Sequence, residues 1–170
     1  LEGGNQTGLA FRSSDDPRVA WIRDPDQMFG FIEDIPLYKS RRHYAFTAPL
    51  PLATGVEARL IEAEAALASG GNWLGILNDL RSNAPALMAG MFPGYPVTVA
   101  PLDPLTDPGN DTAREDLLFS ERAFWLYGTG HRLGDLRRFV RDYGRNQADV
   151  YPSGDYFKGG LHGSDVVLPL

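Results

Sequence analysis

The chain has 170 residues, of which 43% are hydrophobic and 22% charged, a composition typical of one globular domain with its own core. The net charge of −6 argues against a nucleic-acid surface, because phosphate binding needs a basic face and the arginines form no long run. The absence of cysteine excludes disulfides, thiolate nucleophiles and cysteine-ligated metals. The sequence contains no apolar run of about 18 residues, so it predicts no membrane-spanning helix, and the first residues lack signal-peptide features.

Residues 1–52 are predicted to form extended segments and loops that pack on helices. Turn signals recur throughout this region, at Pro17, Pro25, Pro36, Pro49 and Pro51. One short hairpin is expected around Trp21 and residues 29–32. We treat the whole chain, residues 1–170, as a single domain.

The first helical hairpin is predicted over residues 53–84. It begins at a capping box in which the side chains of Thr54 and Glu57 satisfy each other's free backbone amides. Apolar residues then follow at helical spacing, namely Val56, Leu60, Ala63 and Leu67. Glycines at 70–71 end this helix and Asn72 caps the next, and so tight a turn predicts antiparallel packing.

Residues 85–111 are predicted to form one long loop, because prolines and glycines are frequent there. Asp103, Asp107 and Asp111 are spaced in it as carboxylates around a calcium ion would be, although the spacing differs from the helix-loop-helix calcium pattern. The sequence favours two other interpretations, a solvated acidic loop or an N-cap of the next helix by Asp111.

The second helical hairpin is predicted over residues 112–145, followed by a C-terminal loop segment over 146–170. A second capping box, from Thr112 to Glu115, is expected to begin it. Apolar residues surround most of this helix, which is therefore predicted to be the most buried. After a glycine turn comes a fourth helix, whose expected apolar stripe is Leu133, Leu136, Val140 and Tyr143. Its expected water-facing residues are Arg138, Arg141 and Asp142.

The stretch GTGHRLGDLRR, residues 128–138, concentrates charged side chains around the turn between these two helices. His131 and Asp135 lie four residues apart and share a helix face, as two metal ligands would, but no third ligand stands at a suitable spacing. No nucleophile accompanies them for acid–base catalysis. We interpret the stretch as a structural joint in which Asp135 pairs with a nearby arginine. The members of this predicted polar network are Arg122, His131, Arg132, Asp135 and Arg138.

Many aromatic residues lie outside the predicted helices, where most are expected to pack on the core. Flat aromatic faces beside Asp, Asn and Arg are typical of sugar-binding surfaces, because the ring stacks on the sugar while polar neighbours bond its hydroxyls. The candidates for ligand contact are Trp21, Tyr38, Tyr95 and Tyr156.

The predicted fold is therefore mainly α, with two tetratricopeptide-like helical hairpins and long irregular loops. Four motifs, in order and spacing, resemble the C-terminal part of the SusD/RagB family. They are DPR at 16–18, VEARLIEAEAAL at 56–67, NDLR at 78–81 and ERAFWLYGTGHRLGDLRR at 121–138. Leu133-Gly134 replaces the aromatic pair usual in the family, and the chain, which lacks an initiator methionine and the N-terminal part of the family, is expected to be a fragment or a processed form.

Members of that family are cell-surface lipoproteins that bind glycans and other nutrients and cap a SusC-like, TonB-dependent transporter in the outer membrane. The resemblance implies a non-enzymatic binding protein of the cell envelope, at the outer-membrane surface or in the periplasm, with an oligosaccharide or peptide ligand. The residues themselves predict no cofactor and no metal site. The matched motifs would form the scaffold facing the transporter, and variable loops would contact the ligand.

The alternative is a shortened helical scaffold or accessory subunit that mediates protein–protein contacts in a membrane-associated complex. An enzyme ranks third, because no nucleophile, metal set or cofactor loop stands out in the sequence.

Overall fold

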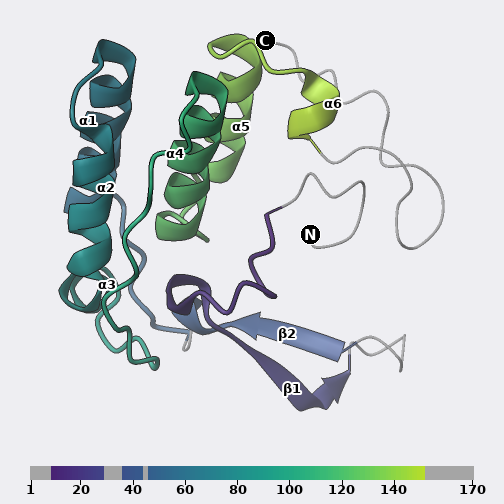
Figure 1. Ribbon diagram of the computed structural model, residues 1–170. Helices are drawn as coiled ribbons and strands as arrows, with labels where there is room; N and C mark the ends of the chain where they lie inside the picture. Colours follow the sequence, from purple (N-terminus) through teal and green to yellow (C-terminus); the bar gives the residue numbers. More distant parts are fainter. Residues whose placement is uncertain (1–8, 29–35, 44–45, 152–170) are drawn as a thin grey trace.

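The computed structural model describes residues 9–28, 36–43 and 46–151, which form a mainly helical protein with a small β-hairpin (Figure 1). The α-helices of this part are α1 (Gly55–Ser69), α2 (Trp73–Ser82), α3 (Ala84–Met91), α4 (Asp111–Trp125), α5 (Arg132–Arg141) and α6 (Gln147–Val150). The strands are β1 (Trp21–Met28) and β2 (Pro36–Ser40), and two 3₁₀ turns flank them, η1 (Pro17–Val19) and η2 (Arg41–His43). The predicted mainly α class is confirmed.

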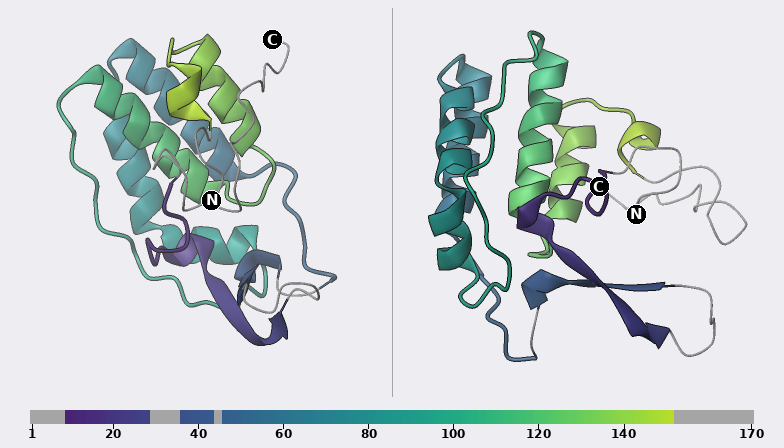
Figure 2. Two further views of the ribbon diagram at one scale, coloured as in Figure 1. Left: turned by 90° about the vertical axis from the view of Figure 1, so that its right-hand side faces the viewer. Right: turned by 60° about the horizontal axis from the view of Figure 1, so that its bottom comes forward.

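The helices form two layers. Figures 1 and 2 show α1 and α2 side by side, with α4 and α5 as the second layer next to them. The tight turn between α1 and α2 is closed by Gly70, whose left-handed backbone (φ 72°) is accessible to glycine at little cost. Between the layers lies an apolar core that includes Leu60, Leu77, Leu118 and Trp125. The buried residues of α4 outnumber those of any other described helix, as its apolar surroundings predicted.

The predicted helix starts are confirmed in the first hairpin and wrong in the second. Thr54 Oγ1 accepts a hydrogen bond from Glu57 N at 3.0 Å, and the Asn72 side chain accepts from Gly75 N. Before α4, the N-cap is Asn110 and neither Thr112 nor Asp111, because Asn110 has extended backbone and its side chain accepts from Ala113 N at 2.9 Å. Glu57 does not reach back to Thr54 but contacts His131.

Helix α3 occupies the first part of what was predicted as a loop over 85–111. Pro85 stands in its first turn, where a missing backbone amide costs nothing, and alanine, leucine and methionine follow as good helix formers. Met88 is buried in the core. The remaining segment is held by α2: Asn78 bonds both backbone groups of Leu105, and Arg81 Nε donates to Asp103 O at 2.6 Å. The prediction of an irregular loop therefore holds only after α3.

The predicted apolar stripe of α5 is wrong at Leu133, which is 47% exposed, while Leu136, Val140 and Tyr143 are half-buried. The buried residues of the helix are Asp135 and Phe139, and Arg138, predicted to face water, is half-buried beside Glu64. Two contacts set which side of α5 faces α4. They are the ion pair of Asp135 with Arg122 and the packing of Phe139 on Phe119, whose ring centroids lie 4.1 Å apart. A carboxylate thus takes a position that periodicity assigns to an apolar residue.

The β-hairpin pairs β1 and β2 antiparallel, with Trp21 opposite Ser40 and Arg23 opposite Tyr38. The expected hairpin at Trp21 is present, and residues 29–32 lie outside the described ranges. In Figures 1 and 2 the hairpin crosses the end of the helical layers at which α4 ends. Within the described residues, no helix has the length and apolar content that crossing a membrane requires.

Candidate functional site

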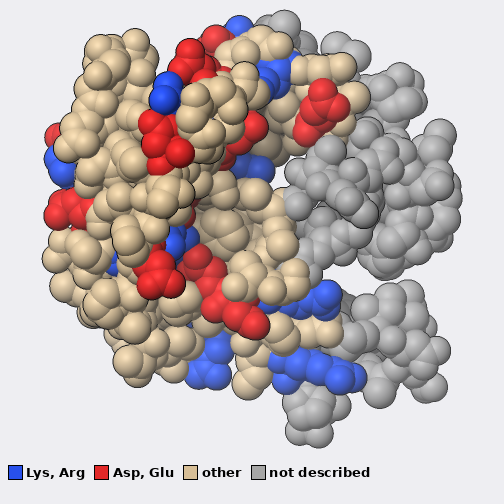
Figure 3. Space-filling view, viewed as in Figure 1, with Lys and Arg blue, Asp and Glu red and all other residues tan. Residues whose placement is uncertain are grey.

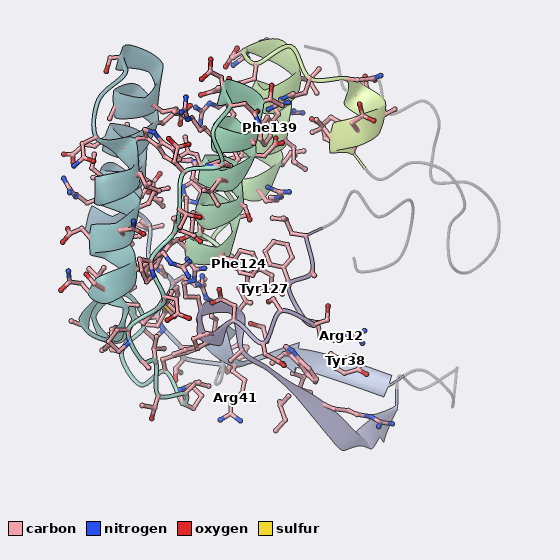
Figure 4. The ribbon with its side chains drawn as sticks, in the orientation of Figure 1. Arg12, Tyr38, Arg41, Phe124, Tyr127 and Phe139 are labelled. Carbon is pink, nitrogen blue, oxygen red and sulfur yellow. The ribbon has the colours of Figure 1, made fainter. Side chains whose placement is uncertain are left out.

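Two aromatic side chains stand together on one face of the hairpin. Trp21 and Tyr38 are diagonal neighbours across the strands, and their rings meet edge to face with centroids 5.0 Å apart. The guanidinium of Arg12 lies 4.6 Å from the Tyr38 ring centre, and the Trp21 indole donates to Arg12 O at 2.8 Å. Figure 4 shows Arg12 and Tyr38 beside each other above the strands. We call Arg12, Trp21 and Tyr38 the aromatic platform.

The aromatic platform has the chemistry of a stacking surface. Trp21 and Tyr38 are 36% and 38% exposed, so each ring keeps area available to a ligand. The hydrogen bond of the indole and the cation over the tyrosine ring fix the orientation of both side chains. Ile22, on the opposite face of β1, is also exposed but has no aromatic neighbour among the contacts of the described residues.

A buried ion cluster anchors the chain just before β1. Only 1% of the Arg18 side chain is exposed, and its Nη1 donates to Glu121 Oε2 at 2.7 Å and its Nη2 to Asp16 Oδ2 at 2.6 Å. Arg81 of α2 donates to the second oxygen of Glu121, also at 2.7 Å. Three segments distant in sequence therefore meet at one carboxylate. We call Asp16, Arg18, Arg81 and Glu121 the Glu121 cluster.

A second buried arginine anchors the chain just after β2. Arg42 donates through Nη2 to Phe124 O at 3.0 Å and to Trp125 O at 3.2 Å, and through Nη1 to Tyr127 O, so it caps the carbonyl end of α4. Its Nε donates to Arg18 O at 2.8 Å, which joins the two anchors. Both ends of the hairpin are thus fixed to the same helix.

Burial and pairing act in opposite directions on these charges. Burial raises the pKa of Asp16, but the hydrogen bonds and charge of Arg18 outweigh it, so the pKa of Asp16 lies below its ordinary value. Burial likewise opposes the charge of Arg18, while Asp16 and Glu121 hold its pKa above the ordinary value. Arg42 faces carbonyl oxygens, and burial lowers its pKa to about 10. All three groups keep their charge at neutral pH.

The other two predicted ligand residues do not join the aromatic platform. Tyr95 donates its hydroxyl to Pro17 O at 2.7 Å and accepts from Ala20 N at 3.2 Å, so it supports the base of the hairpin. Burial raises the pKa of Tyr95, which keeps the hydroxyl protonated for this role. Tyr156 lies outside the described residues.

Of the five residues of the predicted polar network, Arg122 and Arg138 both bond Asp135, whereas His131 bonds residues outside the network. Arg122 Nη2 donates to Asp135 Oδ1 at 2.9 Å, and both side chains are buried. Arg138 also donates to Asp135, at 3.3 Å, and pairs with Glu64 of α1. His131 contacts Glu57 at 2.9 Å and so ties the turn after α4 to α1. Arg132 remains outside these contacts.

Arg132 lines a cavity of about 330 Å³ between α4, α5 and α6. The polar side chains facing the cavity are Asp116, Ser120, Arg132, Arg145, Asn146 and Asp149. Phe119, Leu136 and Phe139 form much of its apolar wall. We call this space the α6 cavity.

The acidic loop binds an arginine of its own chain. Asp107 accepts from Nε and Nη2 of Arg114 at 2.8 and 2.9 Å, and Asp111 accepts from Nη1 at 2.9 Å. The hydrogen bonds from Arg114 lower the pKa of Asp107. Asp103 contributes its backbone carbonyl to Arg81. In the described part of the chain, no group of three or more His, Cys, Asp or Glu side chains is placed to hold a metal.

Charged side chains of both signs are mixed over the helices on the face shown in Figure 3. Several basic side chains gather over the hairpin, where Figure 4 labels Arg12 and Arg41. Over the helices of that face, neither sign of charge forms an extended patch.

Comparison with protein-family models, with curated proteins and with solved structures gives no match to this chain. The resemblance to the SusD/RagB family therefore stays a prediction that rests on the motifs themselves.

Sequence reasoning missed Arg42, Arg12 and the α6 cavity. Arg42 stands in a short 3₁₀ turn with no periodicity, and its partners are backbone carbonyls, which leave no trace in the sequence. Arg12 contacts the Tyr38 ring from a segment without regular structure. The sequence did signal the other anchor of the hairpin, because the arginine of the DPR motif, Arg18, lies buried just before β1.

Proposed function

We propose that this chain is a non-enzymatic nutrient-binding protein of the SusD/RagB type, located at the outer-membrane surface or in the periplasm. In this proposal the hairpin contacts an oligosaccharide, and a tetratricopeptide-like face of the helices docks on a SusC-like, TonB-dependent transporter. Binding involves stacking and hydrogen bonding, and no bond is broken. A peptide is the second ligand class to test.

The observation that carries the proposal is the aromatic platform on a doubly anchored hairpin. Two exposed rings with fixed orientation offer stacking area without the entropic cost of ordering loose side chains. Arg18 and Arg42 hold both ends of the hairpin on α4. A rigid base with exposed aromatic rings is what a sugar-binding surface needs.

The Glu121 cluster supports the family assignment within this proposal. Arg18 belongs to the DPR motif, Arg81 to the NDLR motif and Glu121 to the beginning of the ERAF motif, and all three share one buried contact. Motifs that meet in this way specify a scaffold, which is the role the resemblance gives them. The ligand contacts are then left to the surface beyond the scaffold.

Tryptophan fluorescence offers a direct test. Trp73 and Trp125 are buried, so of the three tryptophans Trp21 is the one a surface ligand reaches. A panel of neutral and acidic oligosaccharides and short peptides would be titrated against the chain, with calorimetry for each positive. We expect one oligosaccharide class to change the Trp21 signal, and Trp21→Ala or Tyr38→Ala to weaken its binding by roughly tenfold or more, as loss of a stacking ring does.

Ile22→Ala is the matched control, because Ile22 is exposed on the same strand but points to the other face. It should leave affinity unchanged. Absence of heat with every sugar and peptide would count against the nutrient-binding function, as would equal losses in Ile22→Ala and Trp21→Ala.

The alternative, an accessory scaffold subunit, is favoured by one observation. The segment before α1 exposes Phe46, Leu50 and Leu52, and Leu52 is 94% exposed. Exposed apolar side chains close together in sequence are typical of protein contacts. Affinity purification from cell envelopes with the double variant Phe46→Ser, Leu52→Ser tests this: a stoichiometric membrane-protein partner lost in the variant, together with no sugar binding, would favour the scaffold role.

A further inference from the structure

The α6 cavity contains a cation whose charge no acidic side chain neutralises by direct contact. Arg132 stands in the first turn of α5, three residues before Asp135, yet the carboxylate of Asp135 is taken by Arg122 and Arg138. Among the residues that the structure describes, Arg132 forms neither a hydrogen bond nor an ion pair. Its half-buried position withdraws the guanidinium from water, and this burial lowers the pKa of Arg132, with only partial compensation by the charge of Asp135.

The buried arginines elsewhere differ from Arg132 in this respect. Arg18 and Arg122 each face a carboxylate at 2.9 Å or less, and Arg42 faces backbone carbonyls. Holding a partly desolvated guanidinium without an acceptor is costly, so such a group is expected where a ligand supplies the acceptor.

A second arginine borders the same cavity with part of its donor capacity unused. Nη2 of Arg145 is bonded to Glu115 and Asp116, at 2.9 and 3.0 Å, but its Nε is buried and has no hydrogen-bond partner. Its guanidinium lies over the Phe139 ring at 5.6 Å, which fixes it at the cavity wall. The cavity thus offers one unpaired cation and one spare donor.

The remaining polar groups fit hydroxyls better than further negative charge. Asn146 uses its side-chain oxygen to cap α6, accepting from Ala148 N at 3.0 Å, so its amide NH₂ is left as a donor. Ser120, which carries a hydroxyl, and Asp149, which carries a carboxylate, also line the cavity. The carboxylates of Asp116 and Asp149 would repel a phosphate dianion. A ligand with one carboxylate and several hydroxyls suits the cavity better, because its carboxylate can accept from an arginine while its hydroxyls donate to an aspartate.

We propose that the α6 cavity binds a small hydroxylated carboxylate, the class of the sugar acids, with the ligand carboxylate on Arg132 and its hydroxyls on Ser120, Asn146 and Asp149. The apolar walls of Leu136 and Phe139 cover the ring. A volume of about 330 Å³ accommodates one such ring. The choice of a sugar acid rests on the proposed function, while the need for a carboxylate rests on the cavity alone.

The test compares D-galacturonate with D-galactose, which share their ring and differ in the carboxylate. Calorimetry and amide chemical-shift titration use the whole chain at low and high salt. We expect galacturonate to bind at least about tenfold more tightly than galactose, to weaken with salt, and to shift amides around 120, 132 and 146. Galactose binding equally well, or shifts confined to the hairpin, would overturn the proposal.

Arg132→Gln should weaken galacturonate binding by about tenfold or more, because charge-assisted bonds to a carboxylate are lost. Arg137→Gln is the matched control: Arg137 is exposed on the same helix and its loss changes the net charge equally. Equal losses in both variants, or none in either, would contradict a site at Arg132. Inorganic phosphate or glycine binding as tightly as galacturonate would reject the sugar-acid class. The shift mapping on the unmodified chain decides the matter even if Arg132→Gln folds poorly.

Failure of this site and failure of the proposed function are separable. If galacturonate binds in the cavity but no oligosaccharide binds at Trp21, the cavity site is supported and the proposed function of the hairpin is rejected. If oligosaccharide binding is lost in Trp21→Ala but unaffected in Arg132→Gln, and galacturonate does not bind, the function of the hairpin is supported and the cavity site is rejected.

Discussion

The Glu121 cluster and the α6 cavity both place arginines against α4, but they treat the charge differently. In the cluster, Arg18 and Arg81 each donate to the same buried carboxylate at 2.7 Å. In the cavity, Arg132 is half-buried and has no acceptor in the described residues. In the Glu121 cluster every arginine is paired with a carboxylate that holds segments of the chain together. In the α6 cavity, the guanidinium of Arg132 is left without a partner in the described part of the chain and is available to a ligand. The contrast separates charges that specify the fold from charges that are suited to a ligand.

Removing Glu121 should have the largest effect on stability. Glu121→Ala leaves Arg18 with Asp16 alone and Arg81 without its carboxylate, in a region where Glu121 itself is buried. We expect the free energy of unfolding to fall by about 3–5 kcal/mol, as when one partner of a buried ion pair is deleted. Urea denaturation followed by circular dichroism measures it. Glu62→Ala, at an exposed pair with Arg59, is the control and should change stability by less than about 0.5 kcal/mol.

Asp135→Ala should follow closely, with a loss of about 3 kcal/mol, because it leaves Arg122 buried without a counter-charge. Arg138 keeps Glu64, which limits the damage. Binding of any ligand at the hairpin should be unaffected at temperatures where the variant is folded. Asp142→Ala removes an exposed carboxylate next to the same helix and should be nearly neutral. Ligand affinity falling more than the melting temperature would show that Asp135 belongs to a site.

Much of the helical scaffold was predictable because its signals are local. The N-caps Thr54 and Asn72 and the turn at Gly70 act within one helical turn of themselves, and all three are where the sequence placed them. Helix α3 was missed because a proline was interpreted as a loop signal although it stands in a first turn. The stripe of α5 was predicted wrongly at Leu133, which is exposed, because the buried ion pair of Asp135 and the packing of Phe139 set which side of the helix faces α4.

The candidate sites were predictable only in part, because they depend on contacts between distant segments. Trp21 and Tyr38 were identified as exposed aromatic candidates, but their pairing requires the strand register. Nothing in the sequence distinguishes Arg132 from its neighbour Arg138, since both lie three residues from Asp135. Only the structure shows that Arg138 pairs with Glu64 while Arg132 faces the cavity.

Arg42→Lys tests the hairpin anchor and should cost less, about 2 kcal/mol. The lysine ammonium is a compact donor that cannot bond the carbonyls of Phe124, Trp125 and Tyr127 as the forked guanidinium does. Beyond the loss of stability, we expect faster amide hydrogen exchange at Arg41, whose N–H bonds Ala20 O at the base of the hairpin. Arg41→Lys is the control, because among the described residues its guanidinium makes one long contact, 3.5 Å to Pro96 O. Unchanged exchange in Arg42→Lys would mean that the hairpin is held by other contacts.

The smallest predicted effects come from two glycines of the stretch at 128–138, and they have opposite signs. Gly130 has a left-handed backbone (φ 87°), so Gly130→Ala should destabilise the chain by about 1–2 kcal/mol even though open space surrounds the position. Gly134 lies inside α5, and a Cβ added there would meet open space, so Gly134→Ala should stabilise by about 0.5–1 kcal/mol through helix propensity alone. Thermal denaturation of both variants measures the difference. Two changes of the same sign would contradict a structural joint at Gly130, because a joint requires the positive backbone angle at one glycine and not at the other.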